Sequence, residues 1–328
     1  MVNGVDHGKI REPRRRSIGS YYGDGRHQAK KAPMLMNFRS LAVCASICVF
    51  SLWTFERALA DKPVKLECKE LSESSGVAVC LGNPDLVWTH NDSGGKPRLY
   101  LMSRTKGKLH AVYDVQGAAN IDWEDMCSFT LAGKNYLAIG DIGDNQRRRE
   151  YVEICVIEEP SIPKSSQPSS LETPIPVSVQ ATLRVRYPDG AYDCEALAFD
   201  PQQNSFILLT KELLTCRVME VPIDVKLLND SSGQKGECRA TLLQAFSLAM
   251  ITGADICPET RQLVVCNYGA AYTLQPDSAH AKLWNAKSMK RLDAPKRQQG
   301  EAIAFAGPKR LLYTSEASPA PLWTVELD

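Results

Sequence analysis

"DCEALAFDPQQNSFILLTKE", residues 193–212, contains two short apolar runs separated by a polar turn. Runs of this length, bounded by Asp, Pro and Asn, are typical of β-strands joined by a tight connection. Acidic residues open the first run and close the second. An antiparallel pair brings those two positions to the same end. The stretch therefore predicts a hairpin with a polar cluster at one end.

The same pattern recurs four more times, while amphipathic helical periodicity is nearly absent. A small or acidic residue opens each first run, and a turn leads to a second run. The other first runs are "SGVAVC" (75–80), "DWEDMCSF" (122–129), "TGADIC" (252–257) and "GEAIAF" (300–305). Their second runs are "LVWTHND" (86–92), "YLAIGD" (136–141), "LVVCNYG" (263–269) and "LLYTSE" (311–316). Most units add a third and a fourth run, and four antiparallel strands repeated around an axis describe a β-propeller.

We therefore expect an all-β chain with five four-stranded blades. The last unit offers only three runs, so "VKLEC" (64–68) is expected to supply its fourth strand. Pairing of the first strand with the last closes the ring and removes two exposed edges. The alternative is a sixth blade hidden within residues 124–195. The segments "EEPSIPKSSQPSSLETPIP" (158–176) and "NDSSGQKGE" (229–237) are expected to be loops.

The N-terminal part has the composition of an export leader. Residues 1–35 are basic and polar, and are expected to be a disordered leader or an upstream start that is not used. Residues 36–60 contain the apolar run 41–53 followed by "ALA", the pattern of a signal peptide. We expect cleavage after Ala60 and a single propeller domain over residues 61–328, in the periplasm or outside the cell. An uncleaved membrane anchor is the alternative.

Charge and cysteine content exclude several classes. After removal of the leader, Asp and Glu outnumber Lys and Arg, which argues against a nucleic-acid binder. No Cys-x-x-Cys pair is present among the nine remaining cysteines, so a zinc ribbon is unsupported. Export would permit disulfides, but an odd number leaves at least one thiol unpaired. We expect a monomer without a membrane span after cleavage.

Unusual polar residues cluster at the starts of the first runs and the ends of the second runs. In a propeller these positions share one face around the axis, so they predict an acidic mouth. Carboxylates with few His or Cys favour a hard cation such as Ca²⁺. The candidate metal ligands are Asp92, Asp122, Asp125, Asp141, Asp144, Asp193 and Asp255. The candidate catalytic residues are Glu124, Glu195, Glu301 and His90, and the candidate ligand-binding residues are Asn91, Lys211, Tyr268, Glu316 and Arg147.

Structural alternatives exist for several of these residues. Asp255 can cap turn amides, and His90 can simply bond a neighbouring blade. The run Arg147 to Arg149 is equally typical of a solvated turn. Trp88 and Trp123 are expected to pack between blades rather than to bind sugars.

The motifs resemble a family of exported bacterial β-propeller proteins. The matching pieces are "THNDSGG", "NIDWED", "IGDIGDN", "YPDGAYDCEAL", "TKE", "TGADI", "QGEAIAF" and "SEA", between residues 89 and 317. The resemblance implies export and a propeller, and it assigns no chemistry. More distantly, the acidic strand starts look like those of calcium-dependent propeller hydrolases, and five-bladed glycosidases use three carboxylates in a propeller mouth. These likenesses concern the fold, which does not fix function.

Two function hypotheses follow. The first is a non-catalytic propeller whose calcium-ordered mouth binds a small-molecule or glycan ligand. The second is a metal-dependent hydrolase of a phosphate ester, lactone or glycoside, in which a mouth carboxylate acts as acid or base. No G-x-S-x-G, H-E-x-x-H or P-loop motif is present, so the common serine, zinc and nucleotide chemistries are unsupported.

Overall fold

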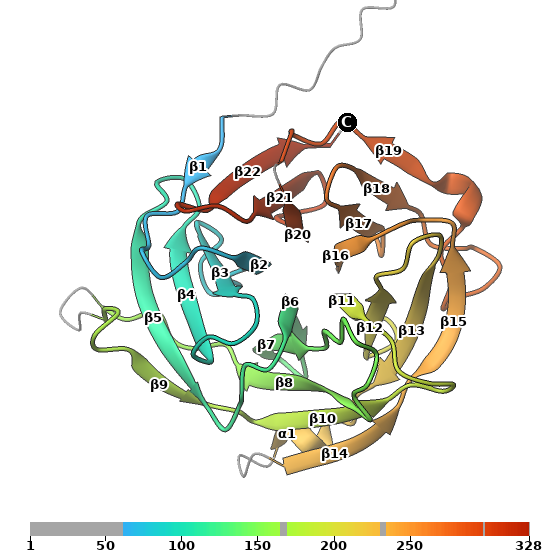
Figure 1. Cartoon of the computed structure of the whole chain (residues 1–328), viewed down its shortest axis with the longest axis horizontal. Coiled ribbons are helices and arrows are strands. Elements are labelled where there is room, and N and C mark those ends of the chain that lie inside the picture. Colours follow the sequence, from blue (N-terminus) through green and yellow to red (C-terminus); the bar gives the residue numbers. More distant parts are fainter. Residues whose placement is uncertain (1–61, 165–168, 230–233, 298, 328) are drawn as a thin grey trace, which may run out of the picture. The chain divides into compact units, whose positions relative to one another are not determined.

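The structure, a computed structural model, describes residues 62–164, 169–229, 234–297 and 299–327. In these ranges five β-sheets surround a central axis, and helix is confined to α1 (Lys226–Asn229) and the 3₁₀ turn η1 (Ala286–Ser288) (Figure 1). The prediction of an all-β, five-bladed propeller is confirmed.

Within each blade the first strand lies at the axis and the last at the outer edge. Blade 1 contains β2 (Ser74–Val79), β3 (Leu86–Asn91), β4 (Arg98–Ser103) and β5 (Leu109–Gln116). Blade 2 contains β6 (Trp123–Leu131), β7 (Lys134–Asp141), β8 (Val152–Glu158) and β10 (Ala181–Arg186). Blade 3 contains β11 (Cys194–Asp200), β12 (Ser205–Thr210), β13 (Cys216–Pro222) and β15 (Thr241–Phe246). Blade 4 contains β16 (Ile251–Ile256), β17 (Leu263–Asn267), β18 (Ala271–Leu274) and β19 (Lys290–Leu292). Blade 5 contains β20 (Gly300–Phe305), β21 (Arg310–Ser315), β22 (Pro321–Glu326) and β1 (Val64–Lys65).

The ring closes where the first strand meets the last. Strand β1 pairs antiparallel with β22, with Val64 opposite Leu322. The backbone amide of Leu66 continues the contact by donating to Ala320 O at 2.8 Å, and the Leu66 side chain is fully buried. The expected N-terminal strand is therefore present, although its ladder is shorter than residues 64–68.

The sixth-blade alternative is wrong, because residues 124–195 contain the rest of blade 2 and no further sheet among the described residues. The two predicted loops are also partly wrong. Strand β9 (Ile175–Ser178) pairs in parallel with β5, and β14 (Gln234–Arg239) pairs in parallel with β10. Each insertion thus returns along the outer edge of the preceding blade, where it covers free backbone groups.

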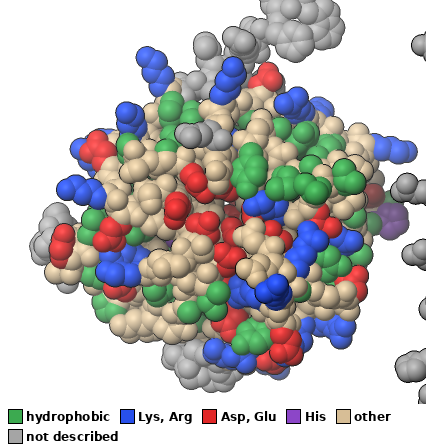
Figure 2. Space-filling view, in the orientation of Figure 1, with side chains coloured by type: hydrophobic (Ala, Val, Ile, Leu, Met, Phe, Trp, Pro, Cys, Tyr) green, Lys and Arg blue, Asp and Glu red, His purple; other side chains and the backbone are tan. Residues whose placement is uncertain are grey.

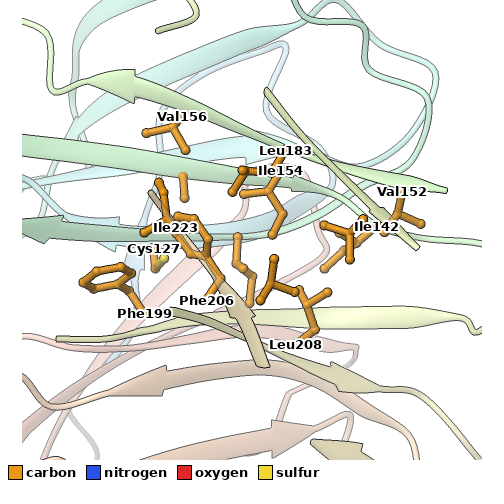
Figure 3. Packing of buried hydrophobic residues seen from close by; sticks show 14 of the residues in the cluster. Cys127, Ile142, Val152, Ile154, Val156, Leu183, Phe199, Phe206, Leu208 and Ile223 are labelled. Atoms are coloured by element: carbon orange, nitrogen blue, oxygen red, sulfur yellow. The ribbon is translucent and has the colours of Figure 1, made fainter. Parts of the chain in front are cut away.

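The core lies between the blades. Five hydrophobic clusters fill the five interfaces between neighbouring blades. Successive strand residues point to opposite faces, so adjacent Val87 and Trp88 enter different interfaces. Figure 3 shows the interface of blades 2 and 3, where Ile154 and Leu183 meet Phe206. Trp88 and Trp123 are both fully buried in the interface of blades 1 and 2, as expected for packing residues.

A β-bulge interrupts the innermost strand of every blade near its start. The bulges fall between Ser74 and Gly76, Trp123 and Asp125, Cys194 and Ala196, Ile251 and Gly253, and Gly300 and Ile303. A bulge inserts one extra, unpaired residue and redirects its side chain. In three blades the inserted position holds glutamate, at Glu124, Glu195 and Glu301. The five bulges therefore repeat one local distortion around the axis.

Candidate functional site

The bulges lie at the acidic end of the axis. Figure 2 shows Asp and Glu side chains gathered near the middle of this face. Glu124, Glu195 and Glu301 come from blades 2, 3 and 5, and their exposed fractions are 5%, 3% and 5%. Burial raises the pKa of Glu195 to about 8 and of Glu301 to about 7. These carboxyls are therefore partly protonated near neutral pH.

Three carboxylates form the tightest cluster. Oxygens of Asp92, Asp122 and Glu124 lie within 4.8 Å of one another. Burial, and then the charges of Glu195, Asp92 and Asp122, raise the pKa of Glu124 well above its usual value. Burial and Asp92 raise the pKa of Asp122 to about 6. Among the described residues no Lys or Arg forms an ion pair with these three, so we call them the acidic triad.

Gly143 allows the acidic triad to be compact. A Cβ atom at this position would lie 2.5 Å from Asp122 Oδ2 and closer still to Glu124. The backbone also contributes, because the Gly143 amide donates to Asp122 O at 3.2 Å. Glycine is a common turn residue, so the sequence alone does not reveal this role of Gly143.

A second group in the mouth centres on a lysine. Lys211 Nζ bonds Glu195 Oε1 and lies 5.2 Å from the centroid of the Tyr268 ring. Burial alone would lower the pKa of Lys211, but the adjacent Glu195 outweighs it and the pKa is raised. On blade 5, Glu316 accepts a hydrogen bond from Gln299 Nε2 at 2.7 Å. The mouth thus combines buried carboxyls with the partly buried ammonium of Lys211.

The "GDIGDN" turn is built by pairing within itself and with its neighbours. Asp141 forms an ion pair with Arg149 at 2.7 Å, and Arg149 Nη1 also donates to Gly143 O at 2.9 Å. Asp144 Oδ2 accepts from the Arg149 amide at 2.7 Å. The Asp144 amide in turn donates to Asp193 Oδ1 at 3.0 Å. These contacts hold Gly143 in position, and each carboxylate of Asp141, Asp144 and Asp193 accepts a hydrogen bond from within the turn.

Asp125 and Asp255 lie deeper along the axis and bond backbone amides. Asp125 Oδ2 accepts from Leu197 N at 3.0 Å and from Ala254 N at 3.2 Å. Asp255 Oδ2 accepts from Phe305 N at 2.8 Å. The innermost strands have no neighbouring strand on the axial side, so backbone amides there need other acceptors. Asp125 and Asp255 accept from three such amides, which belong to blades 3, 4 and 5. The structure thus separates both residues from the acidic triad.

Three further candidates take structural positions. His90 is fully buried, its Nδ1 lies 2.9 Å from Asn91 O, and its ring packs edge-on against Trp123. Burial lowers the pKa of His90 to about 4, so it is neutral at pH 7. Asn91 holds the preceding segment by accepting from Ser72 N at 3.1 Å. Arg147 is exposed, with a left-handed φ of 51°.

Comparison with known proteins adds no family. No family model matches the chain, and no curated protein does. Among solved structures, it is similar to the PQQ-bound aldose sugar dehydrogenase of Streptomyces coelicolor, with TM-score 0.43, 11% identity and coverage of 81% of this chain and 97% of that one. It is also similar to a chain of the nidogen/laminin complex, with TM-score 0.41, 13% identity and coverage of 74% and 72%. The fold is established by the blade topology itself.

The leader and its expected cleavage site lie outside the described residues, as does the apolar run 41–53. Within the described part of the chain, no helix has the length and apolarity needed to cross a membrane. All nine cysteines there are free thiols, and eight of them are buried.

Proposed function

We propose that the acidic mouth is a calcium-dependent binding site for a small-molecule or glycan ligand. The observation that carries the proposal is the acidic triad, in which three carboxylates from two blades approach within 4.8 Å without a compensating Lys or Arg ion pair among the described residues. At such a separation two charges repel by about 3 to 4 kcal/mol at an effective dielectric near 20. A bound cation would remove that cost.

The donor set fits Ca²⁺. Carboxylate oxygens from Asp92, Asp122 and Glu124 are hard ligands, and calcium accepts irregular oxygen shells. Neither His nor Cys belongs to the triad, which disfavours zinc or copper. When bound, the ion would supply positive charge and open positions for oxygen donors of a ligand.

The rest of the mouth suits an oxygen-rich ligand. Lys211 offers an ammonium beside Tyr268, whose partly exposed ring can pack against a sugar face. Glu301, whose pKa burial raises to about 7, is protonated often enough at neutral pH to donate a hydrogen bond to a hydroxyl or carbonyl oxygen. These groups would orient the ligand beside the cation.

Isothermal titration of chelator-stripped protein with Ca²⁺ tests the proposal. Saturable binding with one ion per chain, weakened in Asp122→Asn and Glu124→Gln, is the expected result. Absence of calcium binding would overturn the proposal. Shared protons would then be what reduces the repulsion between the triad carboxyls.

Hydrolysis is the second candidate function. The observation that favours it is the difference between the pKa of Glu195, raised to about 8, and that of Asp122 in the same mouth, raised to about 6. When the pKa values of two carboxyl groups differ in this way, one can act as the general acid and the other as the general base. Turnover of aryl phosphates, lactones or aryl glycosides that disappears in Glu195→Gln, with calcium binding retained, would support it.

We also propose that the protein is exported and begins at Asp61. The support is the apolar run 41–53 followed by "ALA" at 58–60. N-terminal sequencing of protein from its natural source should yield Asp61. An intact Met1 or Met36 on a cytoplasmic protein would contradict it.

A further inference from the structure

A second opening lies at the other end of the propeller axis. The inner strands run away from the acidic mouth, and their far ends surround a cavity of about 380 Å³. All five blades contribute to its lining, through Val79, Phe129, Phe199, Ile256 and Phe305 among others. Cavities of this size accommodate small organic molecules.

The lining has an apolar body and an acidic edge. Phe129 and Phe199 stack with ring centroids 4.2 Å apart and form a rigid aromatic wall. Asp255 and Glu259 of blade 4 supply the charge, and no Lys or Arg of the described chain lines the cavity. Neither carboxylate forms an ion pair with a described residue. Burial raises the pKa of Asp255 to about 7, so Glu259 and ionised Asp255 give the cavity a negative charge that no Lys or Arg of the described residues balances.

We propose that this axial cavity binds a small organic cation, an aryl- or alkylammonium, with its apolar body against the phenylalanines and its positive end towards Asp255 and Glu259. Two physical effects favour a cation over a neutral body of equal shape. The carboxylates attract the ammonium, and aromatic rings attract cations at their faces. The Asp255 oxygens each accept one backbone hydrogen bond, from Ile256 and Phe305, and retain further acceptor capacity.

Three soluble probes of similar shape test the charge requirement: 2-phenylethylammonium, 2-phenylethanol and 3-phenylpropionate. Titration calorimetry on residues 61–328 with Ca²⁺ present should show saturable binding of the ammonium. The alcohol should bind about tenfold more weakly, which corresponds to about 1.4 kcal/mol, and the anion should bind less than either. Equal affinity for the ammonium and the anion would overturn the proposal.

Variants locate the site. Glu259 is exposed, so Glu259→Gln should fold normally, weaken ammonium binding severalfold and leave 2-phenylethanol unchanged. Ala306→Phe adds a ring in the lining and should abolish binding of both probes. Asp122→Asn, at the acidic mouth, should change neither affinity. Competition between Ca²⁺ and 2-phenylethylammonium, or unchanged binding in Ala306→Phe, would place the probe in the acidic mouth and refute an axial site.

Discussion

A Cβ atom at residue 143 would lie 2.2 Å from Glu124 Oε1, so Gly143 and the Glu124 carboxylate fit together only while residue 143 lacks a side chain. The φ of Gly143 is not positive, so alanine would be tolerated by the backbone itself. Any effect of a substitution here therefore reports on the carboxylates.

Gly143→Ala should weaken calcium binding by about tenfold or more, since the methyl group displaces Glu124 and Asp122 from each other. Calcium titration of the variant measures this directly. Gly269→Ala is the matched control, because nothing lies within 4 Å of a Cβ there. Equal calcium affinities in the two variants would show that the triad does not hold the ion.

Calcium should stabilise the folded protein. A ligand that binds only the folded state adds about 2.7 kcal/mol to the free energy of unfolding at one hundred times its Kd. Millimolar Ca²⁺ should raise the melting temperature, Mg²⁺ should do so less because it requires a tight octahedron, and EDTA should lower it. Asp122→Asn should blunt the response, whereas exposed Asp293→Asn should not. Identical calcium responses from both variants would contradict the assignment.

Without calcium, stability should fall as the pH rises from about 4.5 to about 8. The folded-state pKa values of Glu195 and Glu301, about 8 and about 7, exceed those of unfolded glutamate. In this window the folded state binds more protons than the unfolded state, so the free energy of unfolding decreases with pH. Denaturant unfolding at several pH values measures the slope. Glu301→Gln should flatten it, and an unchanged slope would disprove the assignment.

Below about pH 6.5 His90 should offset part of this gain in stability. His90 has a folded pKa of about 4, so the unfolded state takes up its proton first as the pH falls. That uptake destabilises the folded protein on the acid side. The free energy of unfolding of the calcium-free protein should therefore keep rising as the pH falls below 6.5, but with a shallower slope, because one histidine offsets only part of the effect of two glutamates.

Asp200→Asn should cost about 3 to 5 kcal/mol of stability, because it leaves a buried guanidinium without its partner. Arg261 donates to Asp200 Oδ2 at 2.8 Å, both side chains are at most 2% exposed, and the guanidinium also stacks on Trp284. Chemical denaturation measures the loss. Calcium affinity should stay unchanged, because this pair lies at the end of β11 away from the mouth. A shift in calcium affinity would show that the two ends are coupled.

Deletion of residues 61–69 should abolish cooperative thermal unfolding or cause aggregation. It removes β1 and buried Leu66, and it exposes the outer edge of β22. Deletion of residues 61–63 alone, which precede the strand, is the control and should leave the melting curve unchanged. If both truncated proteins melt alike, the pairing of β1 with β22 does not close the ring.

The repeat and its closure were predictable because strand patterning is local. Each apolar run carries its own signal, and a three-strand last unit requires a fourth strand from elsewhere. Strands β9 and β14 were not predictable, because they lie in Pro/Ser-rich or polar segments and are stabilised by the edge they cover. Propensity in those segments favours loops, and tertiary pairing overrides it.

The sequence was sufficient to predict where the mouth lies, but not which of its carboxylates form the acidic triad and which bond backbone amides. Antiparallel pairing alone brings the polar ends together, so Glu124, Glu195 and Glu301 could be grouped. Their common position on a bulge is invisible in sequence, since it depends on the register of neighbouring strands. The amide partners of Asp125 and Asp255 lie 50 or more residues away on other blades, so no spacing rule could separate them from the acidic triad.

The strand that seals the ring is the first propeller segment to be synthesised, and its partner is the last. Domains generally fold as units during translation, from the N-terminus onward. Here the blade formed by β20, β21 and β22 lacks its outer strand until β1, made more than two hundred residues earlier, returns to it. Until β22 has been synthesised the ring therefore stays open, and its unpaired strand edges remain available to chaperones.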